Sequence, residues 1–258
     1  MIHQKYPIAF IFLLSVLLTG LVSCSEFQQK NMIGKTTAMQ MFSERTAKLT
    51  DAIIKKDFGT AKTLLKSGAD INEIGKQDET TPLIWVAMVT KRDLKALEFM
   101  LKQGANPNIR SSRGMSAMSL AASGDSKPLL ELLLVNGGDA TIEGDPLTKG
   151  NAFRRNLLMM AVDAFRDDYF ELLLSHGADV NWNIEGTKGT STVPRVCITI
   201  GRFDWLLYFL DKGYEGNLVQ LGSTVKNIHV SERMEPYKQQ AIQYLKDRGV
   251  DMDAIEVY

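Results

Sequence analysis

Two cysteines and three histidines are the residue types in this chain best suited to act as nucleophiles, general bases or metal ligands. His3 falls in a predicted leader, which leaves His176 and His229, 53 positions apart. His176 directly precedes a turn glycine, where we expect it to be solvated. The sequence contains no Gly-x-Ser-x-Gly elbow, phosphate-binding loop, His-Glu-x-x-His motif or pair of zinc-spaced cysteines. We therefore predict no catalytic, cofactor-binding or metal site and no enzyme activity.

The charged residues favour no nucleic-acid partner. The chain has 30 basic and 30 acidic residues, and no long block of like charge. Paired acids such as Asp167-Asp168 are typical of a solvated turn between helices. Binding to a phosphate backbone needs a broad basic patch, which this composition does not predict.

Cys24 is placed for a different chemistry, the attachment of lipid. Lys5 precedes an apolar run over residues 8–18, and Leu21-Val22-Ser23-Cys24 follows. The run is shorter than the ~20 apolar residues that a membrane-spanning helix needs, so we predict a secretory signal over residues 1–23. Its ending resembles the lipobox of bacterial lipoproteins, and the resemblance implies that Cys24 becomes the lipid-modified first residue. An ordinary cleavage site beside an incidental cysteine is the alternative.

The resemblance also implies a location. In Gram-negative lipoproteins a residue other than aspartate after the cysteine usually directs the protein to the outer membrane, and Ser25 stands there. We expect a lipid anchor and a polar tether over residues 24–43, with the folded domain over residues 44–258 on the periplasmic face. Cys197 would then be the only thiol, and we predict that it is a core residue rather than a reactive one.

The residues that bind a partner would be positioned by a repeat. An apolar pair, two polar residues and a glycine recur five times, and the glycines are 36, 33, 40 and 36 positions apart. A degenerate sixth copy ends at Gly249. A unit this short cannot bury its apolar face alone and must stack on its neighbours. The five glycines are expected to follow a helix in the left-handed conformation: Gly68, Gly104, Gly137, Gly177 and Gly213.

Two phrases resemble the ankyrin repeat. Gly68-Ala69-Asp70-Ile71-Asn72 and its copies at Gly104 and Gly177 match the stretch after the second helix, and Thr81-Pro82-Leu83 matches the start of the first. The resemblance covers about residues 47–251. It implies an all-α solenoid of about six helix–turn–helix repeats with finger-like hairpin loops and degenerate end caps. A tetratricopeptide array is the alternative, and Gly-Ala-Asp-x-Asn argues against it.

The spacing between the start of the first helix and the turn glycine is the same in three repeats and longer in one. The predicted N-cap residue lies 21 positions before the turn glycine at Ser116, Asn156 and Thr192, but 23 positions before it at Thr81. Two residues are therefore inserted in the Thr81 repeat.

Ankyrin proteins bind other proteins through their fingers and first helices, so the resemblance implies a protein partner. The chain between Gly137 and Gly177 is seven residues longer than a 33-residue period, and we place the insertion at residues 143–150, which include Glu143 and Asp145. Insertions in solenoids map to loops, often on the binding face. Neutral drift in a surface loop is the alternative.

Aromatic and arginine side chains near the fingers are the candidate partner-binding residues. Trp182 stands where the ankyrin pattern usually has a small or polar residue, so it could anchor a partner or pack under the preceding finger. Trp85 and Trp205 are expected in the core. Arginine favours interfaces because its planar fork can pair with a carboxylate twice, and four arginines fall on neighbouring fingers: Arg110, Arg113, Arg154 and Arg155.

These observations together favour a non-enzymatic, lipid-anchored ankyrin protein, monomeric when free, that binds another protein. The sharper hypothesis is an immunity protein that inhibits a secreted toxin, for example a type VI secreted phospholipase or a cell-wall hydrolase. A scaffold or chaperone for an envelope enzyme is the alternative within the same class. An enzyme with unrecognised chemistry at residues 214–236, near His229, is the alternative of a different class.

Overall fold

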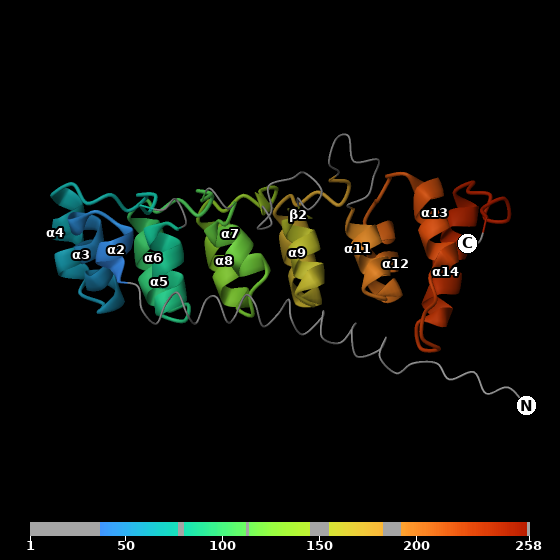
Figure 1. Ribbon diagram of the computed structural model, residues 1–258, viewed down its shortest axis with the longest axis horizontal. Helices are drawn as coiled ribbons and strands as arrows, with labels where there is room; N and C mark the ends of the chain where they lie inside the picture. Colours follow the sequence, from blue (N-terminus) through green and yellow to red (C-terminus); the bar gives the residue numbers. More distant parts are fainter. Residues whose placement is uncertain (1–36, 77–79, 112–113, 145–154, 183–191, 257–258) are drawn as a thin grey trace, which may run out of the picture.

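The computed structural model describes residues 37–76, 80–111, 114–144, 155–182 and 192–256. In these residues, pairs of antiparallel helices stand side by side in one row (Figure 1). The six pairs confirm the all-α ankyrin solenoid: α3 (Glu44–Ile54) with α4 (Phe58–Lys66), α5 (Pro82–Val89) with α6 (Leu94–Lys102), α7 (Ala117–Ala122) with α8 (Lys127–Val135), α9 (Leu157–Asp163) with the 3₁₀ turn η2 (Asp167–Tyr169) and α10 (Phe170–Ser175), α11 (Val193–Thr199) with α12 (Phe203–Asp211), and α13 (Leu218–Asn227) with α14 (Glu235–Asp247).

The first helices of the second to fifth repeats begin where the sequence predicts, because a side-chain oxygen caps each of these four. Asn156 accepts a hydrogen bond from the Met159 backbone N–H at 2.9 Å. Ser116 and Ser119 each accept from the backbone N–H of the other, at 3.1 and 2.9 Å. These bonds satisfy helical N–H groups that have no partner within the helix. Thr81 and Thr192 cap α5 and α11 in the same way.

The second helices end at the predicted glycines, all of them left-handed. Their φ angles are 91° at Gly68, 91° at Gly104, 89° at Gly137, 90° at Gly177 and 92° at Gly213. Gly249 has φ 81°, so the degenerate sixth phrase makes the same turn. An L side chain at these positions would strain the backbone, which explains why glycine recurs.

The core runs through the row as one apolar layer between neighbouring pairs. Trp85 and Trp205 are 6% and 5% exposed, as expected of core residues. Cys197 is completely buried, and burial raises the pKa of its thiol far above the ordinary value, so the thiol stays protonated. The prediction of an unreactive core cysteine is confirmed.

The packed region begins before the predicted boundary at residue 44. Residues 38–41 form a short helix, α2 (Ala38–Met41), and Ala38, Met41 and Phe42 are buried. The Phe42 ring lies 6.4 Å from that of Trp85 in an edge-on arrangement. The end of the predicted tether therefore covers the first repeat. The signal sequence and Cys24 lie outside the described residues.

The last repeat is more regular than the sequence suggested. The segment 214–236, which an unrecognised enzyme activity would use, contains α13, a helix of 10 residues. Lys226 Nζ donates to the backbone oxygens of Met252 and Ile255 at 2.8 and 2.5 Å, which fastens the end of the chain to this helix. His229 is exposed and follows α13 in the connection to α14.

None of the helices in the described residues is both long enough and apolar enough to cross a membrane.

The two edges of the row differ. We call the edge formed by the short connections within each helix pair the turn edge, and the edge formed by the longer connections between pairs the finger edge (Figure 1). At the turn edge the first helices differ in length, with 11 residues in α3, 8 in α5, 6 in α7 and 7 in α9 and α11.

Candidate protein-binding surface

Asparagine side chains hold the fingers in a regular row. Asn72 lies four residues after Gly68, and its amide nitrogen donates to the Gly104 carbonyl of the next repeat at 2.9 Å. Its amide oxygen accepts from the Asn106 backbone N–H at 2.8 Å. The same pair of bonds recurs from Asn108 to Gly137 and Asp139, and from Asn181 to Gly213 and Glu215. Each asparagine thus ties one finger to the next through the backbone.

One of these connections is missing in the middle of the row. The equivalent residue after Gly137 is Thr141, whose hydroxyl donates to its neighbour Asp139 at 2.6 Å instead of reaching the next repeat. The predicted insertion, residues 143–150, lies here, and its first two residues form β1 (Glu143–Gly144), which pairs with the antiparallel strand β2 (Arg155–Asn156). The asparagine bonds are therefore absent between the long finger, which follows Gly137, and the finger that follows Gly177. We call this place the finger joint.

Trp182 joins the long finger to the finger after it. Its indole N–H donates to the Glu143 carboxylate at 3.2 Å, across 39 residues of sequence. The ring is half-buried and packs against the core. Of the two alternatives for Trp182, packing under the preceding finger describes the buried part of its surface. The joint still places an indole and a carboxylate side by side at the finger edge.

The candidate arginines are in two different situations. Arg110 is exposed at the base of its finger. Arg155 forms an ion pair with Asp163 at the end of α9, and about a third of each side chain is exposed, 34% and 35%. Burial raises the pKa of the Asp163 carboxyl, and the Arg155 guanidinium opposes that rise. Arg113, Arg154 and Asp145 lie outside the described residues.

The two histidines are not brought together. His176 is exposed, and its Nδ1 lies 2.9 Å from the Leu172 carbonyl in the last turn of α10. His229 lies two repeats further along the row. No group of three or more His, Cys, Asp or Glu side chains in the described residues is arranged to hold a metal ion.

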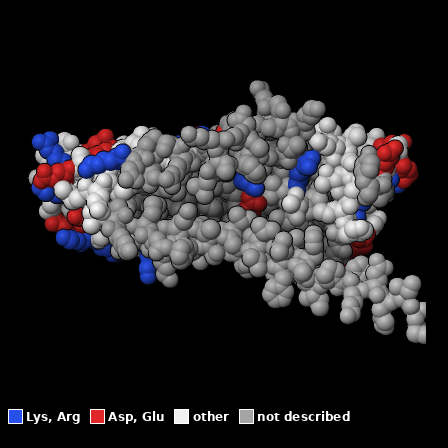
Figure 2. All heavy atoms as spheres, in the orientation of Figure 1, with Lys and Arg blue, Asp and Glu red and all other residues white. Residues whose placement is uncertain are grey.

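Charge is mixed over the surface that Figure 2 shows in colour. Basic and acidic side chains are interspersed at the end of the row formed by α3 and α4. This arrangement matches the balanced composition and favours contacts between individual charged side chains over long-range attraction.

The sequence predicted the position of the finger joint but not its contacts. The 40-residue spacing located the long finger, but the pairing of Trp182 with Glu143 follows from the stacking of two repeats. A signal was available in Thr141, which breaks the series of asparagines at the fourth residue after the turn glycine.

Comparison with known families agrees with the geometry. A family model described as ankyrin repeats, in three copies, matches residues 49–143 and 83–184. No curated protein matches the sequence significantly.

Proposed function

This chain belongs to the ankyrin-repeat family, and from that premise we propose that it is a lipid-anchored periplasmic protein that binds and inhibits a secreted toxin. Ankyrin repeats act as protein-interaction scaffolds, so a role in binding protein partners is the basis of the proposal. The finer assignment rests on the resemblance of Leu21-Val22-Ser23-Cys24 to a lipobox. An inhibitor needs only to cover an active-site cleft or to block a closing motion.

The main support for this binding surface is the arrangement of side chains at the finger joint. Trp182 and Glu143 lie within hydrogen-bonding distance where the asparagine series is interrupted, and exposed Arg110 lies on the preceding finger. Tryptophan and arginine are enriched among the residues that dominate interface energies. The asparagine bonds hold the neighbouring fingers in place, so little conformational entropy is lost when a partner binds.

The direct test is capture of a partner by soluble protein from residue 25 onward, using envelope extract and lysates that contain candidate effectors. We expect a toxin to be retained and its activity to fall at one-to-one stoichiometry. Trp182→Ala should weaken capture at least about tenfold if the indole contributes a typical hot-spot energy. Arg248→Ala is the matched control, because Arg248 stacks on Tyr244 in the last repeat, far from the joint.

Two outcomes separate the proposal from its alternative. Deletion of the gene should sensitise cells to the toxin; unchanged survival alongside an adjacent secreted effector contradicts the immunity role. Retention of a resident envelope enzyme that stays active, with lower activity of that enzyme after deletion, supports a scaffold instead.

The lipid anchor needs its own test. Cys24→Ser should release the protein from the membrane fraction, because the thiol that would carry the lipid is lost. An unchanged membrane association of Cys24→Ser would mean that the anchor is not at this residue.

A further inference from the structure

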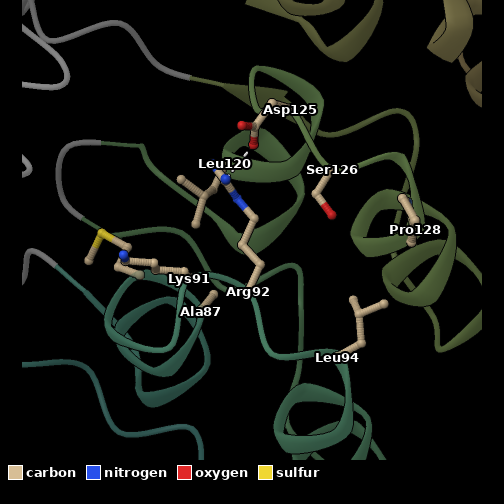
Figure 3. Close-up of a pocket in the computed structure, with 9 residues that line it drawn as sticks. Ala87, Lys91, Arg92, Leu94, Leu120, Asp125, Ser126 and Pro128 are labelled. Atoms are coloured by element: carbon tan, nitrogen blue, oxygen red, sulfur yellow. Dashed lines mark hydrogen bonds and ion pairs between the residues drawn. The ribbon is translucent and has the colours of Figure 1, made fainter.

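A cavity of about 530 Å³ opens at the turn edge between the second and third repeats, on the opposite edge from the fingers (Figure 3). Its apolar lining comes from four helices and includes Met88 of α5, Leu94 of α6, Leu120 of α7 and Pro128 of α8. The volume is within the range of small-molecule sites. Polar groups contribute about as much of the lining as apolar ones: Lys91, Arg92, Asp125 and Ser126.

The cavity exists because neighbouring repeats differ in length. Helix α5 has 8 residues and α7 has 6, and the extra two are the insertion that the spacing from Thr81 to Gly104 predicted. At 1.5 Å per residue, the connection after α5 projects about 3 Å beyond that after α7. Residues 90–93 therefore overhang the next repeat, and the cavity lies beneath them.

Two consecutive basic residues form the overhang. Lys91 and Arg92 have φ angles of 51° and 65°, in the left-handed region that residues other than glycine rarely adopt. Arg92 extends toward Asp125 of the third repeat and forms an ion pair with it, as Figure 3 shows. Asp125 thus compensates the charge of Arg92.

Lys91 is left with the excess charge. It lies on the other side of the cavity from Leu94 and Pro128 in Figure 3. Among the residues that the structure describes, no carboxylate lies within ion-pairing distance of its ammonium group. The flexible four-carbon side chain allows the ammonium to swing over the opening. The Ser126 hydroxyl adds a further polar group to the lining.

We propose that this cavity binds a small carboxylate that carries an apolar chain. The apolar floor formed by Leu94, Leu120 and Pro128 takes the chain, and Lys91 pairs with the carboxylate. The lining has one positive charge in excess, which matches a monovalent carboxylate better than a doubly charged phosphate. Burying the chain contributes about 0.8 kcal/mol per CH₂ group. This site is independent of the proposed inhibition, because it lies on the edge opposite the finger joint.

The test measures binding of octanoate, below its micelle concentration, to the soluble protein from residue 25 onward by calorimetry and by methyl NMR. We expect one site and shifts confined to the Met88, Leu94 and Leu120 methyl groups. Lys91→Asn should weaken binding about tenfold by removing a charged partner, while asparagine tolerates the left-handed backbone. Lys95→Gln, an exposed lysine on α6 outside the cavity, should leave binding unchanged.

Three further arms decide the outcome. Octylamine and inorganic phosphate should each bind at least about tenfold more weakly than octanoate, since one lacks the carboxylate and the other the apolar chain. Leu94→Trp should block the cavity and abolish binding without touching Lys91. The proposal is overturned if octanoate does not bind, if Lys91→Asn binds it as well as wild type, or if either control ligand binds equally.

Discussion

The turn edge is built differently in the first and the last repeats. In each of the first two repeats one basic residue of the turn reaches across to the next repeat: Lys56 Nζ lies 2.6 Å from Asp93 Oδ2, and Arg92 pairs with Asp125. In the fourth and fifth repeats the bases stay within their own turn. Arg166 pairs with Asp168, and Arg202 with Asp204.

These repeats differ both in length and in the residues of the turn. Asp93 lies 12 positions after Thr81, whereas the equivalent residues lie 10 positions apart in the third, fourth and fifth repeats. A longer first helix carries its turn outward until its basic residue overhangs the following repeat. A turn at the same level as its neighbour leaves the base nearest to its own acid. The local acid differs as well: an aspartate lies two positions after Arg166 and Arg202, whereas Leu94 lies two positions after Arg92.

A cluster of aromatic rings joins the fourth and fifth repeats. The Phe170 ring of the fourth repeat lies 5.2 Å from that of Trp205 and 4.8 Å from that of Phe209 in the fifth. Arg202 stacks over Trp205, with its guanidinium carbon 3.5 Å from the ring centroid. A stacked pair, Phe58 and Phe99, joins the first two repeats, but the cluster around Phe170 contains more rings.

Truncation of an aromatic ring should produce the largest contrast. Phe170→Ala is expected to lower the free energy of unfolding by about 3–5 kcal/mol, because Phe170 is 3% exposed and contacts several rings. Phe99→Ala is the matched change in the first half, where a half-buried ring stacks only on Phe58 at 4.4 Å. Chemical denaturation should show a smaller loss for Phe99→Ala. Equal losses would contradict the different reliance on aromatic packing.

Removing an asparagine from the finger edge should have the next largest effect. Asn108→Ala deletes two hydrogen bonds between repeats and leaves the Asp139 backbone N–H without its side-chain partner. We expect a loss of about 1–3 kcal/mol in the free energy of unfolding. Asn136→Ala removes an asparagine that bonds only within its own helix and should cost less.

Adding an asparagine at position 141 tests why the asparagine bonds are absent from the finger joint. Thr141→Asn restores the residue that the other repeats use and is expected to stabilise the protein by about 0.5–1 kcal/mol. Loss of stability in this variant would show that the long finger holds the joint in a geometry that the asparagine bonds do not fit.

The two turn-edge arginines should differ although their side chains are equally exposed, 29% for Arg92 and 27% for Arg202. Arg92→Met loses one surface ion pair and should cost about 0–1 kcal/mol. Arg202→Met also loses the stacking on Trp205 and should cost about 1–2 kcal/mol. Thermal unfolding of both variants checks the order, and the reverse order would mean that the bridge between repeats outweighs stacking.

The smallest effect is a dependence on pH in the first half. A hydrogen bond from Lys56, together with backbone N–H groups at the start of α6, lowers the pKa of the Asp93 carboxyl. A lowered folded-state pKa stabilises the protein above the unfolded value of about 3.9, and this contribution disappears as pH falls through the folded value. The difference in melting temperature between wild type and Asp93→Asn should therefore be present at neutral pH and vanish in acid. A constant difference would exclude the carboxylate charge as its cause.

Much of the candidate surface was accessible from sequence, but its contacts were not. The spacing of turn glycines located the long finger and the inserted residues after Thr81. The sequence left open whether Trp182 anchors a partner or packs under a finger, because its burial depends on a finger that belongs to the preceding repeat. Likewise, the arginines at 155 and 110 fall on similar fingers, yet only Arg155 is paired, since α9 ends in Asp163.

The sequence by itself determined the repeat, the caps and the turns, because each depends on residues a few positions apart: Thr81 with Ile84, or Gly104 with the helix before it. The tertiary structure alone decided which repeats are joined by asparagine, ion pair or ring, and where a cavity opens. Those contacts depend on how far each helix extends relative to its neighbour, which no short stretch of sequence specifies.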